Sequence, residues 1–174
     1  MEEIEIRESE PGDFASIEKL YPDVFPDEDL LPLVKELLQE APDILSLAGI
    51  INSSLVGHVI FTICEISESS IKVALLGPLA VATNWQRQGI GSAIVRAGLQ
   101  RLENDSVSHV YVLGDPAYYG RLGFMPEVGV VPPYSLPAEW LGAWQSKSLP
   151  NAEPPQPGKL SVPRPWRKPE LWAD

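Results

Sequence analysis

One stretch of the sequence, residues 75–102, passes from a β-rich run through a polar turn into a helical pattern. The β-rich run ends near Ala82, and the turn contains two glycines, Gly89 and Gly91. A strand that leads directly into an amphipathic helix is typical of chains that pack helices against a sheet, in the α/β or α+β class. The apolar positions that define the helix are Ile90, Ile94, Ala97 and Leu102.

The turn before this helix has the properties of an anion site. A helix start presents N–H groups without intrahelical partners, and the positive end of the helix dipole lies behind them, so phosphate can bind there. Glycine allows close approach to the backbone, and Arg87 adds positive charge. Alternatively, the two glycines only ease helix packing. The Rossmann motif requires a small residue where Ile94 stands, and a P-loop requires Lys after its glycine, so neither nucleotide motif is present.

Hydrophobic periodicity predicts the other elements, and their order agrees with an α/β (α+β) layout. In chain order, we expect a strand at 4–7, a helix from 14 with Asp13 as N-cap, a helix at 29–40 that ends at Pro42, strands at 44–51, 55–66 and 71–82, a helix from 89, a strand at 109–114 and a helical turn at 117–122. The first two long strands form a hairpin around residues 52–54.

A proline interrupts the third of these strands. Proline cannot donate to a β-ladder, so Gly77-Pro78 predicts a bulge that frees the backbone groups of the next residues for another partner. The alternative is an edge strand, which tolerates proline.

Beyond Phe124 the composition changes, since residues 125–174 hold 11 of the 18 prolines and four of the five tryptophans. We therefore expect one domain at residues 1–130 and a Pro- and Trp-rich extension at 131–174 packed on it. Short strands are expected at 143–149 and 159–162. Trp140, Trp144 and Tyr134 either anchor this extension or line a substrate site.

Charge and composition narrow the function. The formal net charge of −11 argues against nucleic acid or an anionic membrane as partner and favours a cationic one. No apolar run is long enough to span a membrane, and an acidic N-terminus is unlike a secretory signal, so we expect a cytoplasmic protein. The single cysteine, Cys64, excludes an internal disulfide, and His58 and His109 have no metal partners at ligand spacing, which disfavours a metal site.

Two motifs together resemble a known family. Gln86-x-x-Gly89-x-Gly91 follows the Gly77-Pro78 strand, and Tyr119-x-x-x-Gly123-Phe124 follows the next strand. This arrangement closely resembles the GNAT N-acetyltransferase superfamily, including its branch of uncharacterised bacterial predicted acetyltransferases. The resemblance implies the GNAT fold, a mixed central sheet of about six to seven strands flanked by helices, with the fourth strand bulged.

The resemblance also implies acetyl-CoA as co-substrate, and no metal. Its pyrophosphate is expected on the backbone amides of the loop, and its pantetheine arm is expected to pair with the bulged strand. The main-chain N–H near Val81 would polarise the thioester carbonyl. The cofactor-binding residues implied in this way are Leu79, Ala80, Val81, Arg87, Gln88, Gly89, Ile90, Gly91 and Ser92.

Two residues are expected to move protons. Tyr119 occupies the position from which a family tyrosine protonates the departing CoA thiolate, or else it packs against the cofactor. An amine acceptor arrives protonated, so a base is needed, and the candidates are Glu65, Glu68 and Asp115. Of these Glu65 is our choice, although it can equally be a surface residue at the end of its strand.

The expected function is acetyl transfer from acetyl-CoA to a primary amine of a small molecule or peptide, by direct attack on the thioester. The acceptor is not encoded in any motif. Two alternatives stay open, a CoA-binding or regulatory module without catalysis and a transferase for a longer acyl-CoA. No nucleic acid or membrane partner is expected, and the protein would act as a monomer or homodimer.

Overall fold

The longest strand, β3 (Ser54–Ile66), is buried along most of its length because apolar residues occupy both of its faces. The computed structural model describes residues 3–40, 43–150, 152–154 and 157–173. The chain divides into two compact units, unit 1 (Met1–Phe61 and Gly77–Gln100) and unit 2 (Thr62–Leu76 and Arg101–Asp174). Strand β3, strand β4 (Lys72–Val81) and helix α3 (Ile90–Asn104) each contribute residues to both units.

Unit 1 has strands in the order β1-β2-β3-β4. Strand β1 pairs antiparallel with β2, with Glu5 opposite Ile50. Besides its parts of β3, β4 and α3, the unit contains β1 (Glu5–Glu8), η1 (Pro11–Asp13), α1 (Phe14–Val24), α2 (Leu31–Glu40), β2 (Ile44–Ile51) and η2 (Thr83–Trp85).

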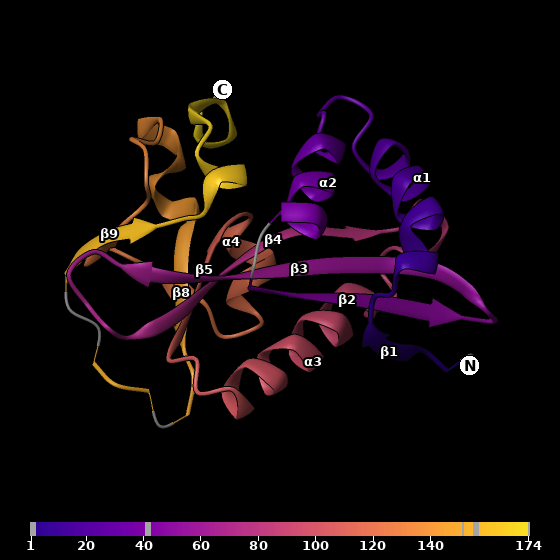
Figure 1. Ribbon diagram of the computed structural model, residues 1–174, viewed down its shortest axis with the longest axis horizontal. Helices are drawn as coiled ribbons and strands as arrows, with labels where there is room; N and C mark the ends of the chain where they lie inside the picture. The colour runs from indigo at the N-terminus through magenta and orange to yellow at the C-terminus, as the bar shows by residue number, and fades with distance from the viewer. Residues whose placement is uncertain (1–2, 41–42, 151, 155–156, 174) are drawn as a thin grey trace. The chain divides into compact units, whose positions relative to one another are not determined.

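Helices cover both faces of the unit 1 strands. Helices α1 and α2 lie on one face and α3 on the other (Figure 1). A Cβ atom placed on Gly57 would lie 2.6 Å from Ile94 Cδ1 of α3, whereas the next residue, His58, contacts Tyr21 of α1. Because adjacent strand residues point to opposite faces, this alternation separates the two helical layers.

Unit 2 has strands in the order β3-β4-β5-β8-β6. Strand β4 pairs parallel with β5, and β5 pairs antiparallel with β8, so the sheet is mixed. The additional elements are β5 (His109–Leu113), α4 (Pro116–Gly120), β6 (Met125–Pro126), β7 (Val130–Val131), η3 (Ala138–Ala143), β8 (Trp144–Ser148), β9 (Gly158–Ser161), η4 (Arg164–Trp166) and η5 (Pro169–Trp172).

The C-terminal segment is held by buried tryptophans, each of which has a partner for its indole N–H. Trp144 donates to the Val130 carbonyl at 2.8 Å, and Trp166 donates to Thr62 Oγ1 at 3.1 Å. Trp172 donates to the carbonyl of Trp166 at 3.1 Å. The burial and hydrogen bond of Trp144 agree with the anchoring alternative, which stays a prediction.

The predicted order of elements is confirmed, including the hairpin of β2 and β3 and the strands that became β8 and β9. The helix predicted from residue 89 begins at Ile90. Pro42, the predicted end of the second helix, lies outside the described residues. The short strands β6 and β7 were not predicted, because two-residue strands show no periodicity. The turn η3 was not predicted either.

Helix α3 approaches β3 closely at Gly98, which generates a prediction about stability. A Cβ atom at Gly98 would overlap the ring of Phe61. Gly98→Ala should therefore lower the free energy of unfolding by about 1–2 kcal/mol, even though alanine is the better helix former. Urea unfolding measures this change. In a Phe61→Leu background the same substitution should cost clearly less, and an equal loss in both backgrounds would contradict the overlap.

Candidate functional site

Strand β4 changes its backbone at the position where a bulge is predicted. In unit 2, β4 lies between β3 and β5, and its described parallel register with β5 runs from Val73 to Leu76. Gly77 follows with φ +146°, and the Gly77-Pro78 peptide bond is cis. Pro78 itself belongs to unit 1, where β4 is the last strand of the order β1-β2-β3-β4, so the edge-strand alternative for Pro78 stays open. The bulge stays a prediction, supported by the missing N–H of Pro78.

The three residues after Pro78 form the end of β4. Ala80 is buried, and Leu79 and Val81 are half-buried. The Ala80 carbonyl oxygen lies 3.5 Å from the position that a Cβ atom on Gly57 would take, so this end of β4 runs beside β3. The Val81 carbonyl accepts a hydrogen bond of 2.9 Å from Gln86 Nε2, which ties the following loop to the strand.

The loop before α3 has free donors at its end. Ala93 N–H donates to the Gly89 carbonyl at 3.0 Å, so the helical hydrogen bonds begin there. The N–H groups of the first helical residues, Ile90, Gly91 and Ser92, have no intrahelical partners, and the positive end of the helix dipole lies at the same place. Arg87, Gln88 and Gly89 are exposed. This geometry is that of an anion site.

Gly89 is favoured by its backbone conformation and not by a lack of room for a side chain. Its φ is +81°, in the region that side chains disfavour, and a Cβ atom there would meet nothing within 4 Å. Arg87 also has positive φ, +63°. From the sequence, glycine at position 89 was expected because it allows an anion to approach the backbone closely. The positive φ of Gly89 adds a second, conformational reason.

Tyr119 lies in unit 2 on the short helix α4. Asp115 caps this helix by accepting a 2.9 Å hydrogen bond from the Ala117 N–H. The Tyr119 ring is 9% exposed and packs edge-on against Tyr118 and Phe124. Burial raises the pKa of its phenol, so the group stays protonated at neutral pH and can act as a proton donor.

The carboxylates proposed as bases are all exposed. Glu65 stands at the end of β3, opposite Ser161 of β9. Glu68 lies in the turn after β3 with φ +64°, and Asp115 is occupied as the helix cap. The structure therefore gives none of the three a buried setting.

Sequence reasoning missed a buried polar chain in unit 1. The Tyr21 hydroxyl lies 2.7 Å from His58 Nδ1, and Ser46 Oγ lies 2.7 Å from His58 Nε2. Ser46 Oγ also lies 2.6 Å from Ser9 Oγ. The available signal was a histidine inside the apolar run of β3, since a buried imidazole normally needs partners for its ring nitrogens.

His58 is fully buried, and burial lowers its pKa to about 4. Asp13 opposes this shift by its negative charge, but the effect is smaller. Asp13 is itself paired with Arg7 at 2.8 Å, and that hydrogen bond lowers the pKa of its carboxyl group. The imidazole is therefore neutral at pH 7 and can both accept and donate a proton.

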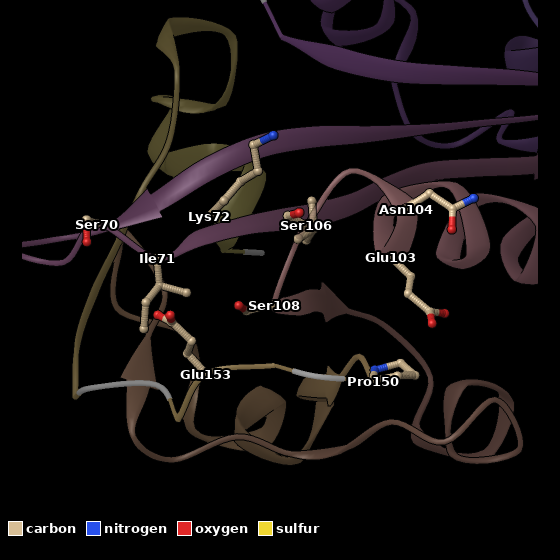
Figure 2. A pocket seen from close by; sticks show the side chains of 10 residues that line it. Ser70, Ile71, Lys72, Glu103, Asn104, Ser106, Ser108, Pro150 and Glu153 are labelled. Carbon is tan, nitrogen blue, oxygen red and sulfur yellow. The ribbon is translucent and has the colours of Figure 1, made fainter.

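Cavities on the described surface include three that concern the residues discussed above or in Figure 2. The first, about 550 Å³, is lined by the start of β4 and the end of α3, whereas the loop joins the opposite ends of these elements. Figure 2 shows its polar lining, which includes Lys72, Glu103 and Glu153. The second, about 330 Å³, lies where α1 leads into α2 and includes Tyr21. The third, about 540 Å³, includes Ser9 and Ser46.

Comparison with known proteins identifies the family of this chain. The Acetyltransferase (GNAT) family model matches residues 14–124. The uncharacterized N-acetyltransferase YjhQ of Escherichia coli K12 is 35% identical over 129 residues, which cover 70% of this chain and 71% of that protein. The chain therefore belongs to the GNAT acetyltransferase family, which confirms the resemblance seen in the sequence.

Two solved structures show the same fold. The acetyltransferase YhbS from Escherichia coli, in complex with CoA, superposes with a TM-score of 0.87 at 24% identity, covering 97% of this chain and 94% of that chain. A GNAT family acetyltransferase from Brucella melitensis, in complex with acetyl-CoA, gives 0.74 at 25% identity, covering 94% and 98%. The predicted GNAT fold is thus confirmed.

The structure also bears on metals and membranes. Among residues 3–40, 43–150, 152–154 and 157–173, no cluster of three or more His, Cys, Asp or Glu side chains is placed to hold a metal ion. Within the same described part of the chain, no helix is both long enough and apolar enough to cross a membrane.

The buried His58 generates a prediction about pH and stability. The unfolded chain binds a proton at His58 below its usual pKa of 6.5, whereas the folded chain does so only near 4. Stability that is present above pH 6.5 is therefore lost as the pH falls toward 4, by about 3 kcal/mol at most. Urea unfolding at pH 7, 5.5 and 4.5 measures this loss.

His58→Gln provides the comparison, because glutamine does not titrate in this range. The variant is expected to be less stable at pH 7, and its stability should fall less steeply with pH than that of the wild type. His109, whose pKa burial also lowers, contributes the same background slope to both proteins. Equal slopes would show that His58 does not control this pH range.

Proposed function

We propose that the protein transfers the acetyl group of acetyl-CoA to a primary amine of a small molecule or peptide. The observation that carries this proposal is the loop between β4 and α3, whose free N–H groups meet at the positive end of a helix. Membership of the GNAT family supports the reaction class. The names of the curated relatives, N-acetyltransferases, support nitrogen as the acceptor atom.

The proposed cofactor contacts follow the loop and the strand before it. The backbone N–H groups of residues 87–92 bind the pyrophosphate, and the pantetheine arm pairs with Leu79, Ala80 and Val81. The Val81 N–H polarises the thioester carbonyl and stabilises the negative charge that develops when the amine attacks. The CoA and acetyl-CoA complexes of the two solved relatives support this assignment.

The reaction proposed is direct attack, with Tyr119 as the acid that protonates the CoA thiolate. The phenol carries its proton when the thiolate forms, but its raised pKa makes it a weaker acid, so the role rests on the position of Tyr119 in the family motif. Glu65 stays the predicted base from the sequence, and its exposed position adds no support. Attack by an amine requires no metal in this mechanism.

We further propose a cytoplasmic protein that acts as a monomer or homodimer without nucleic acid or membrane partners. The net charge of −11 supports the absence of nucleic acid and membrane partners, because anionic polymers and surfaces would be repelled. The same charge favours a cationic acceptor, and the cavity at the end of α1 carries Asp27, Glu28 and Asp29 on its wall.

Acetyl-CoA binding and turnover test the proposal directly. Acetyl-CoA should raise the melting temperature, and free thiol should appear with at least one amine of a panel of peptides with free α-amino groups, peptides with lysine side chains and polyamines. Gly89→Ala should weaken acetyl-CoA binding at least tenfold in calorimetry, because the loop cannot keep its φ of +81° without strain.

Gly12→Ala is the matched control for this substitution. Gly12 lies in the same unit, and its Cβ atom would also meet nothing within 4 Å, but its φ is not positive. The control should bind acetyl-CoA like the wild type. If acetyl-CoA did not raise the melting temperature of the wild type, the cofactor assignment would be overturned. A shift without thiol release from any amine would favour the non-catalytic module, and release only from longer acyl-CoA would favour that donor.

Tyr119→Phe tests the acid. Without the phenol, thiolate departure loses its proton donor, and kcat should fall by about 10²-fold while acetyl-CoA affinity stays within about threefold. Stopped-flow thiol detection with the best amine of the panel gives kcat, and calorimetry gives the affinity. Tyr118→Phe, on the half-buried neighbour, is the control. An unchanged kcat in Tyr119→Phe would remove the general-acid role.

A further inference from the structure

The buried polar chain of unit 1 joins two of the cavities. Its members are Tyr21 on α1, His58 on β3, Ser46 on β2 and Ser9 after β1, and every link is 2.6 or 2.7 Å long. Tyr21 forms part of the cavity at the end of α1. Ser46 and Ser9 form part of the cavity of about 540 Å³ at the start of α1. We call these four residues the relay.

The interior of the relay is sealed from water. His58 is 0% exposed, so protons can pass between Tyr21 and Ser46 only through the imidazole, and Tyr21, which is 1% exposed, lines the cavity at the end of α1. Hydroxyl and neutral imidazole groups each donate one hydrogen bond and accept another, which is the property that proton transfer along a chain requires. A purely structural pairing would satisfy the histidine without extending to a surface cavity at either end.

Two hydrogen bonds connect the elements that carry Tyr21 and His58 with the end of β4 and the residues after it. The Ala82 N–H donates to the Val56 carbonyl at 2.8 Å, which sets the end of β4 next to the His58 segment of β3. Two residues along α1 from Tyr21, Asp23 Oδ2 accepts a 3.4 Å hydrogen bond from Thr83 Oγ1, two residues beyond Val81. All of these residues belong to unit 1.

We propose that the relay removes the proton of the amine acceptor during acetyl transfer, entering at Tyr21 and leaving through Ser9. This inference rests on the proposed function, because it assigns the base of the same reaction. It replaces the exposed carboxylates as the route for the proton.

The transfer balances without a charged intermediate in the relay. The ammonium group gives a proton to the Tyr21 oxygen, while the Tyr21 proton passes to His58 Nδ1. The proton on His58 Nε2 passes to Ser46 Oγ, whose own proton moves to Ser9 Oγ, and Ser9 releases its proton to water. The acceptor becomes a neutral amine, water becomes hydronium, and His58 exchanges one neutral tautomer for the other.

The surroundings of His58 agree with this neutral exchange. The titratable groups that face it are Tyr21 from α1 and, at longer range, Asp13 from η1, whose charge is compensated by Arg7 from β1. Burial opposes a charged imidazole and holds the pKa of His58 near 4. His58 therefore enters each cycle unprotonated at neutral pH.

The pH profile of Tyr21→Phe tests the relay, with the most active amine of the panel as acceptor. Without the hydroxyl, only amine that is already neutral reacts, so the acid limb of kcat should move up to the pKa of the free amine. At two pH units below that pKa, we expect kcat to fall at least tenfold. One unit above it, kcat should be within about twofold of the wild type.

His58→Gln and Ser46→Ala interrupt the relay at its centre and its exit, and both should show the same pH-dependent defect. Tyr111→Phe is the matched control, because Tyr111 is a fully buried tyrosine of unit 2 whose hydroxyl has no hydrogen-bond partner among the described residues. Its pH profile should coincide with that of the wild type. Acetyl-CoA thermal shifts check that every variant is folded.

The outcomes separate the relay from the function. A defect of the same size at every pH, or none, in folded Tyr21→Phe and Ser46→Ala would overturn the relay and leave the acetyltransferase proposal standing. Absence of acetylation by the wild type across the panel would overturn the proposed function and the relay with it. A defect that disappears above the pKa of the amine supports the relay.

Discussion

The close approach of α3 to the strands of unit 1 is the constraint on which the candidate site depends. Ile94 stands in the second turn of this helix, and its Cδ1 atom occupies space that a Cβ atom on Gly49 or Gly57 would need. A side chain at either of these two strand positions would require Ile94 to move. The same helix presents its first N–H groups to the proposed anion site, so the packing at these two glycines of β2 and β3 helps to position that site. The proposed site consists mostly of backbone atoms, but the position of its helix depends on the contact of Ile94 with Gly49 and Gly57.

The sequence was sufficient for the elements that make this arrangement, because each carries a local signal. Long apolar runs predicted β2, β3 and β4, and helical spacing predicted α3. It was insufficient for the packing between them. Gly49 and Gly57 look unremarkable within apolar strands, and only the placement of Ile94 shows why they lack side chains. The sequence also could not show that β4 is internal in unit 2, since strand order depends on long-range pairing rather than on local periodicity.

The residues proposed for cofactor binding could be predicted from the sequence, whereas those proposed for proton transfer through the relay could not. The cofactor loop is a contiguous segment, so its glycines, its turn and its helix start are all visible in residues 86–92. The groups that handle protons come from separate elements, and nothing in the spacing of Ser9, Tyr21, Ser46 and His58 indicates that they meet. Sequence reasoning chose Glu65 because a carboxylate is the usual base. The strand pattern left open whether Glu65 is a surface residue, and the structure shows that it is exposed.

Burial decides which kind of proton acceptor can act here. An exposed carboxylate exchanges protons with water as readily as with a bound amine, whereas a hydroxyl–imidazole chain inside the protein conducts only between its ends. A charged base beside the thioester would also oppose the negative charge that forms on the carbonyl oxygen during attack. A neutral chain avoids this opposition, because its members carry no net charge before or after the transfer. The lowered pKa of His58 is therefore compatible with a part in catalysis, since the imidazole acts by exchanging tautomers rather than by holding the proton.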